Sequence, residues 1–157
     1  MIFTLNIILG VVTGIIHLYI RGFPSDAGTI SSILLLHQFV VLFGDVGIVG
    51  FFSNIAFAEK NAKYLGWPGG PWQIKYGFSQ IAIGVLGVMC IWFRGGFWTA
   101  TLINWYMYSI SGTWSHLNSI KMKGKKDKNE IAMIIVTIIY AIYLTVLSTN
   151  IDGFWTF

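Results

Sequence analysis

Asp45 is the first residue in this sequence whose type and place suggest chemistry. It is the only charged residue in the long apolar segment 27–58. A carboxyl near the middle of a membrane helix costs about 2.5–3.5 kcal/mol on insertion scales, so it must be neutral, paired or hydrated. No lysine or arginine lies within an apolar segment to pair with it. We therefore expect a protonated acid that donates a structural hydrogen bond to an acceptor in segments 76–93 or 95–120. The alternatives are a proton or ion path and a metal or substrate ligand.

Segment 95–120 carries a second polar signal. Polar residues recur there at spacings of three and four, namely Thr101, Asn104, Tyr108, Ser111, Ser115 and Asn118. On a helix this spacing places them on one face, which we expect to point into the protein. Hydrogen bonds between helices, about 0.6 kcal/mol each, explain such a stripe. The alternative is the wall of a hydrated or ligand-binding cavity. Trp105 and Trp114 lie off the stripe and are interpreted as lipid-facing or packing residues.

Three histidines raise the question of a haem or a metal ion. His17 lies about one turn from the end of the first apolar segment, and His37 lies about 12 Å into the second, counted at 1.5 Å per residue. His116 lies near the far end of segment 95–120. A bis-histidine haem needs two ligands at one depth, and this count gives no such pair. We therefore predict neither haem nor metal. The candidate intramembrane polar site consists of Asp45, His37, Asn104, Tyr108, Ser111 and His116.

Motifs of the common enzyme classes are missing from the sequence. It contains no HExxH, CxxCH, GxSxG, P-loop or dinucleotide fingerprint. The single cysteine, Cys90, rules out an intramolecular disulfide. We therefore predict no catalytic residues and no cofactor.

The composition indicates what must position these residues. Of the 157 residues, 55% are hydrophobic and 10% are charged, whereas about a quarter of a typical soluble domain is charged. The charges separate uncharged stretches that reach the roughly 20 residues needed to cross a bilayer. Backbone groups in lipid must bond within their own segment, which favours helices. We predict one all-α transmembrane bundle over 1–157, with helices at about 1–20, 29–58, 76–93, 97–120 and 131–150.

Glycines mark where these helices are expected to touch. Helices in lipid associate through close packing at small residues. Such residues recur at short spacings in the first three segments, namely Gly10, Gly14, Gly44, Gly47, Gly50, Gly77, Gly84 and Gly87. We predict that they pack inside the bundle, with contacts to another copy or a partner subunit as the alternative.

The basic residues predict an orientation. Arg21 and Arg94 lie alone in the first and third loops. The other eight of the ten lie in the second and fourth loops, namely Lys60, Lys63, Lys75, Lys121, Lys123, Lys125, Lys126 and Lys128. By the positive-inside rule, these two loops are cytoplasmic. Five spans then place the N-terminus inside and the C-terminus outside a cell membrane. The first segment lacks a charged leader and an Ala-x-Ala site, so we interpret it as a retained helix.

The second loop contains "GWPGGPWQIK", residues 66–75. Two prolines stiffen a turn that Gly69 and Gly70 permit. Its predicted interfacial residues are Trp67, Trp72, Gln73 and Lys75. We expect a lid or anchor at the level of the lipid headgroups, because aromatic and basic side chains gather there. A docking surface for another subunit and a substrate-binding loop are the alternatives.

Residues 51–118 resemble an uncharacterised prokaryotic family of small polytopic membrane proteins. The resemblance depends on a Gly-Trp-Pro…Pro-aromatic-Gln loop and the helix after it, here Gly66, Trp67, Pro68, Pro71, Trp72 and Gln73, followed by Gly84, Val85, Leu86 and Gly87. It implies a histidine at the end of the fourth helix, which His116 matches. It also implies a histidine where Asn54 stands and an acidic residue where Lys75 stands, and there this chain departs from the pattern. The resemblance implies a helical bundle and assigns no activity.

Together these features predict a non-catalytic membrane protein that is an accessory subunit of a larger complex, such as a respiratory or monooxygenase assembly. Its expected partners are membrane lipids and other integral membrane subunits, and no nucleic acid. The alternative is a small transporter, proton path or lipophilic-ligand-binding protein centred on Asp45. The two hypotheses differ in whether Asp45 faces a cavity or is sealed by hydrogen bonds.

Overall fold

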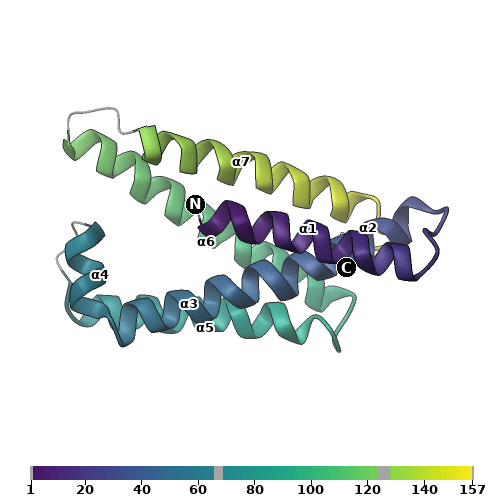
Figure 1. Ribbon diagram of the computed structural model, residues 1–157, viewed down its shortest axis with the longest axis horizontal. Coiled ribbons are helices and arrows are strands. Elements are labelled where there is room, and N and C mark those ends of the chain that lie inside the picture. The colour runs from purple at the N-terminus through teal and green to yellow at the C-terminus, as the bar shows by residue number, and fades with distance from the viewer. Residues whose placement is uncertain (1, 66–68, 124–127, 157) are drawn as a thin grey trace.

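The computed structural model describes residues 2–65, 69–123 and 128–156, and all regular structure in these ranges is helical (Figure 1). The elements are α1 (Ile2–Ile20), α2 (Ala27–His37), the π-helical η1 (Gln38–Phe43), α3 (Gly44–Ile55), α4 (Ala58–Leu65), α5 (Pro71–Met89), α6 (Gly96–Lys123) and α7 (Lys128–Thr149). The prediction of an all-α chain is confirmed.

Within the described residues, three segments are long and apolar enough to cross a membrane: Phe3–Ile20, Ala27–Ile55 and Lys128–Thr149. The second joins α2, η1 and α3 into one continuous helix, as predicted, although it ends at Ile55 rather than at residue 58. The helices α5 and α6 have 19 and 28 residues and are therefore long enough, but their polar residues lower their mean hydropathy below that of the three segments. The chain therefore has the helices of a membrane protein, and three of the five predicted spans meet this measure.

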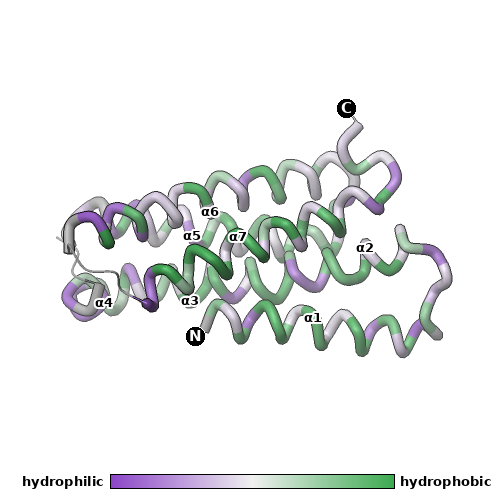
Figure 2. Tube along the Cα trace, turned by 90° about the horizontal axis from the view of Figure 1, so that it is seen from above, coloured by the Kyte–Doolittle hydropathy of each residue, from purple (hydrophilic) through white to green (hydrophobic). Residues whose placement is uncertain are grey.

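Two boundaries differ from the sequence prediction in a way that matters for the site. Residues predicted as part of the second loop form the short helix α4, which turns across the bundle axis at one end (Figures 1 and 2). In addition, α5 begins at Pro71 rather than at residue 76. Gly69 and Gly70 adopt positive φ angles of 68° and 92° and so permit the turn into Pro71, as the sequence predicts. Proline suits the first turn of a helix because its missing N–H has no intrahelical partner there.

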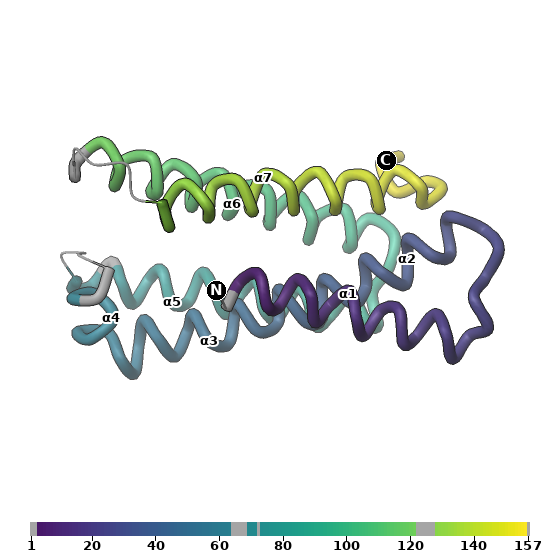
Figure 3. Tube along the Cα trace, turned by 45° about the horizontal axis from the view of Figure 1, so that its top comes forward, coloured from purple at the N-terminus to yellow at the C-terminus, as the bar shows by residue number. Residues whose placement is uncertain are grey.

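The long helices form two pairs, α3 with α5 and α6 with α7, and α1 packs against α2 and η1 (Figures 1 and 3). The α4 region and the ends of α6 and α7 that face it lie at one end of the bundle, here called the lysine-rich end. The α1–α2 connection, the α5–α6 turn and the C-terminal residues lie at the other, the short-loop end (Figure 1). The second and fourth loops therefore approach the same end, as their charge predicts.

The helix α1 reaches only half of the bundle, because Ile2 lies near its middle (Figures 1 and 3). We call the half that contains α1 and α2 the closed half, and the half beyond the start of α1, towards α4, the open half. The closed half is packed with large rings. Phe43 stacks on Trp105 with ring centroids 4.3 Å apart, and Phe39 meets Trp98 edge to face.

The short-loop end is closed by caps. Thr29 donates its backbone N–H to the Asp26 carboxylate at 2.6 Å, which caps α2 and lowers the pKa of Asp26. Phe154 is buried, its carbonyl accepts a bond from the Thr99 hydroxyl, and the Trp155 indole donates to Ser148. The chain after α7 therefore folds back against the bundle.

Glycines bring the helices into close contact, as predicted. A Cβ placed on Gly47 would lie 2.5 Å from the Cα of Gly84, and one on Gly87 would lie 2.3 Å from the Phe39 carbonyl oxygen. On α1, Gly10 and Gly14 lie against side chains of η1 and α2. These glycine faces are used inside the chain itself.

Candidate functional site

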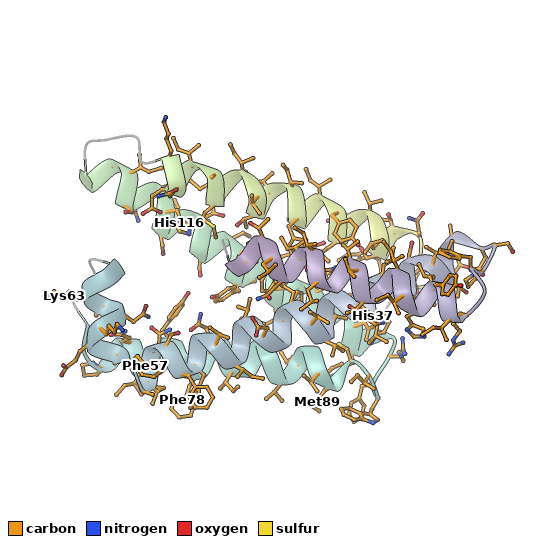
Figure 4. The ribbon with its side chains drawn as sticks, viewed as in Figure 1. His37, Phe57, Lys63, Phe78, Met89 and His116 are labelled. Atoms are coloured by element: carbon orange, nitrogen blue, oxygen red, sulfur yellow. The ribbon has the colours of Figure 1, made fainter. Side chains whose placement is uncertain are left out.

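A cavity of about 420 Å³ lies in the open half, between α3 and α5 on one side and α6 and α7 on the other. Phe3 and Asn6, from the first turns of α1, line it as well. Its polar lining residues are Asn6, Asp45, Tyr76, Gln80, Tyr108, Ser109, Thr113, His116 and Thr137. Figure 4 shows side chains projecting between the two helix pairs in this region, with His116 on α6.

Asp45 lies in the first turn of α3 and faces this cavity. The Asn6 side-chain amide donates a hydrogen bond to its Oδ2 atom. The sequence prediction is therefore wrong about the partner, which lies on α1 rather than in segments 76–93 or 95–120. Oδ1 has no hydrogen-bond partner in the described part of the chain. The sequence carries no signal that pairs Asn6 with Asp45, because the two residues lie 39 positions apart on different helices.

A chain of polar side chains leads from α4 to the cavity. Asn54 donates to Gln80 at 2.7 Å, Gln80 donates to the Tyr108 hydroxyl at 2.9 Å, and the Tyr108 and Tyr76 hydroxyls lie 3.1 Å apart. At the α4 end, Gln73 donates to Asn54 at 3.3 Å and to the Ala58 carbonyl at 2.9 Å. The chain fixes the orientation of both tyrosines in the cavity wall.

Gln73, expected at the membrane interface, is buried. The early start of α5 places it in the first helical turn, against Asn54, rather than in the loop. Lys75 is exposed at the lysine-rich end, and Trp67 and the Trp72 side chain lie outside the described residues. The predicted interfacial loop is thus only partly described.

The face of α6 that lines the cavity is rotated from the predicted stripe. It carries Trp105, Tyr108, Ser109, Gly112, Thr113 and His116. Ser111 and Ser115 are exposed instead and donate to the carbonyls of Tyr108 and Ser111 on their own helix. Asn104 is half-buried away from the cavity, whereas Trp105, 2% exposed, packs in the core. Thr101 is buried and Tyr108 lines the cavity, as an inward-facing stripe predicts. The prediction is wrong for Ser111 and Ser115, because serine satisfies its hydroxyl within a helix and therefore tolerates a lipid-facing position.

His116 and His37 occupy different surroundings. His116, in the cavity wall, pairs through Nδ1 with the Glu130 carboxylate of α7, to which Ser119 also donates at 3.0 Å. His37 lies in the closed half, where its Nδ1 is 3.0 Å from the Thr13 hydroxyl and its Nε2 is 3.0 Å from Nδ1 of His17. Of the candidate site, Asp45, Tyr108 and His116 therefore share the cavity, and His37, Asn104 and Ser111 do not.

The contact between His17 and His37 corrects the depth argument from the sequence. Side chains lean towards the N-terminus of their own helix. Because α1 and α2 are antiparallel, the two imidazoles lean towards each other and meet near the level where Gly14 contacts Leu34. A count along the backbone omits this lean and keeps the two residues apart.

Two buried polar atoms in the residues lining the cavity have no partner within the described ranges. They are the indole nitrogen of Trp105 and the hydroxyl of Ser109. Leaving such a group unbonded costs about 1–3 kcal/mol. No group of three or more histidine, cysteine or acidic side chains in the described ranges is placed to hold a metal ion. The chemistry that the site offers is therefore hydrogen bonding and charge in an apolar, aromatic-lined cavity.

No curated protein and no solved structure matches this chain. Residues 1–151, which include every helix described above, match the model of a family of unknown function, DUF6790. The family description assigns no ligand or activity, so the prokaryotic distribution and loop signature implied by the resemblance stay predictions. The chain belongs to the DUF6790 family.

Proposed function

We propose that this chain is a multi-pass membrane protein that binds a lipophilic small molecule in the cavity of its open half. The observation that supports this most is the composition of the cavity wall. It combines Val46, Val49, Met133 and aromatic rings with polar groups from five helices. Small-molecule sites are typically concave and mostly apolar, with a few polar groups that fix the orientation of the ligand.

The proposal includes five membrane spans. The helices α5 and α6 are as long as the other spans and run alongside them (Figure 1). Several of their polar side chains, Gln73, Gln80 and Ser109, are buried within the bundle, so they do not have to face lipid. The second and fourth loops, rich in lysine, would lie in the cytoplasm. The N-terminus is then cytoplasmic and the C-terminus lies outside.

Native mass spectrometry of the full chain, released from mild detergent, tests ligand binding. The probes are ten-carbon amphiphiles that differ in the head group: decanol, decanoate and decylamine. Gly112→Leu is the blocking variant, because a Cβ at Gly112 meets nothing within 4 Å and Gly112 lines the cavity. Gly96→Ala is the control, since Gly96 is equally unobstructed and does not line the cavity.

We expect the wild type and Gly96→Ala to bind at least one probe with one-to-one stoichiometry, and Gly112→Leu to lose at least tenfold in affinity while its helical content stays unchanged. Equal binding by the blocked variant, or no binding of any probe to the wild type, would contradict the proposal.

The accessory-subunit hypothesis is the competing proposal. The contacts that motivated it in part, the glycine faces, are occupied within the chain. Mild-detergent purification of the tagged native protein tests it. Stoichiometric recovery with other membrane polypeptides, for instance of a respiratory or monooxygenase assembly, would support it. A monomer or homo-oligomer with a bound small molecule would favour the ligand-binding proposal.

A further inference from the structure

We propose that the ligand is a lipophilic organic cation, an amine or quaternary ammonium with an apolar body, whose charged head lies against Asp45. This inference depends on the proposed function and narrows the chemical class of the ligand. Three features of the cavity support it: its charge, the free oxygen of Asp45 and the aromatic rings that line the same cavity.

The acidic and basic side chains that line the cavity in the described part of the chain are Asp45 of α3 and His116 of α6. No lysine or arginine among the described residues lines it. His116 is paired with Glu130 of α7. Asp45 has no basic partner among the described residues. An ionised carboxylate in an apolar site is costly unless a counter-charge is present. A cationic ligand supplies that counter-charge.

The hydrogen bonding of Asp45 leaves room for a ligand. Asn6 binds Oδ2 and thereby orients the carboxyl, while Oδ1 has no partner among the described residues. Asn6 cannot neutralise the carboxylate because its amide is uncharged. A protonated amine at Oδ1 would add a charge-assisted hydrogen bond, which is about twice as strong as a neutral one. A quaternary ammonium has no N–H and would interact with the carboxylate through its charge alone.

Aromatic rings form a row in the same wall. Phe3 lies nearly parallel to Trp105 with centroids 6.1 Å apart, Trp105 lies 5.6 Å from Tyr108, and Tyr76 stacks on Tyr108 at 6.2 Å. Cations are attracted to the faces of such rings, by about 2 kcal/mol or more when desolvated. Trp105 is almost fully buried, whereas Phe3, Tyr76 and Tyr108 are half-buried. These three rings are therefore the ones that a ligand in the cavity can contact.

The exposed lysines favour a different ligand at first sight. Lys60, Lys63, Lys75 and Lys121 lie at the lysine-rich end and attract anions. None of them lines the cavity, however, so their charge acts at the surface rather than at Asp45. The cavity therefore predicts a cationic ligand, whereas the surface lysines predict an anionic one. Comparing decanoate with the cationic probes distinguishes these two predictions.

The test compares protonated decylamine, decyltrimethylammonium, decanol and decanoate by native mass spectrometry of the full chain at pH 7. The variant is Asp45→Asn. The control is Asp152→Asn, which removes the same charge from an exposed site at the short-loop end. We expect the wild type and Asp152→Asn to bind both cations at least tenfold more tightly than decanol, and Asp45→Asn to lose this preference while it still binds decanol.

Three results would overturn the inference. They are equal binding of cations and decanol by the wild type, tighter binding of decanoate, or a cation preference that survives in Asp45→Asn. The comparison of decyltrimethylammonium with decanol needs only the wild type, so it tests the preference for cations even if Asp45→Asn fails to fold. Binding of decanol without a cation preference would leave the proposed function intact, whereas binding of no probe would contradict both.

Discussion

The closed and open halves of the bundle contain similar polar side chains, but these side chains have different roles in the two halves. In the closed half α1 covers the interface, so His37 bonds to Thr13 and His17, and Gln38 accepts from Tyr140 and donates to the Ile7 carbonyl. In the open half only the first turns of α1 reach the cavity, and the polar chain from Asn54 through Gln80 ends there. The difference teaches that a polar group in this fold is structural where helices pack directly over it and is available to a ligand where it borders the cavity.

Glycine substitutions should give the largest contrast between the halves. In the closed half, a Cβ at Gly87 would lie 2.3 Å from the Phe39 carbonyl oxygen and 2.7 Å from the Phe43 Cβ. We expect Gly87→Leu to lower the free energy of unfolding by about 3 kcal/mol or more through overpacking. Gly112→Leu in the open half should change the free energy of unfolding by no more than about 0.5 kcal/mol. Thermal unfolding in detergent, followed by circular dichroism, measures both. Similar losses in the two variants would show that the open half is as tightly packed as the closed half.

The two buried glutamines should give the next largest contrast. Gln38 is fully buried, and its loss leaves the Tyr140 hydroxyl without its acceptor. Gln80 borders the cavity, where water can replace it at Tyr108. We expect Gln38→Ala to cost about 3 kcal/mol and Gln80→Ala about 1 kcal/mol. The denaturation midpoints of the two variants measure these losses of stability. A larger loss in Gln80→Ala than in Gln38→Ala would argue against a hydrated cavity.

The smallest effect is expected at the link between α6 and α7. The His116 and Glu130 side chains are 34% and 17% exposed, so solvent weakens their attraction. We predict that Glu130→Gln costs less than about 1 kcal/mol. The same midpoint measurement tests this, and a cost above that of Gln80→Ala would show that this ion pair holds the open half together.

Much of the architecture could be predicted from the sequence, because it depends on local pattern. The helical class, the glycine contacts such as Gly47 with Gly84, and the common end of the lysine-rich loops follow from composition and spacing. Asp45 stands out from its apolar surroundings for the same reason.

What the sequence could not predict depends on how helices sit against one another. The cavity lies between the α3–α5 pair and the α6–α7 pair, and no local pattern reports how far apart these two pairs lie. The face of α6 was misjudged because Ser111 satisfies itself within its helix while Trp105 turns inward. The His17–His37 contact depends on the lean of two side chains across an antiparallel interface.

The most direct test of the account is the reaction of an engineered thiol with a charged, water-soluble methanethiosulfonate reagent. Such reagents attack the thiolate, which forms only where water reaches the sulfur. The native Cys90 is fully buried in the closed half, so the wild-type chain is an unreactive baseline. We predict that Thr113→Cys, in the cavity wall, is modified in the folded protein, whereas Thr101→Cys, buried in the closed half, is modified only after denaturation. A folded Thr113→Cys protein that resists the reagent as Thr101→Cys does would contradict an accessible cavity in the open half.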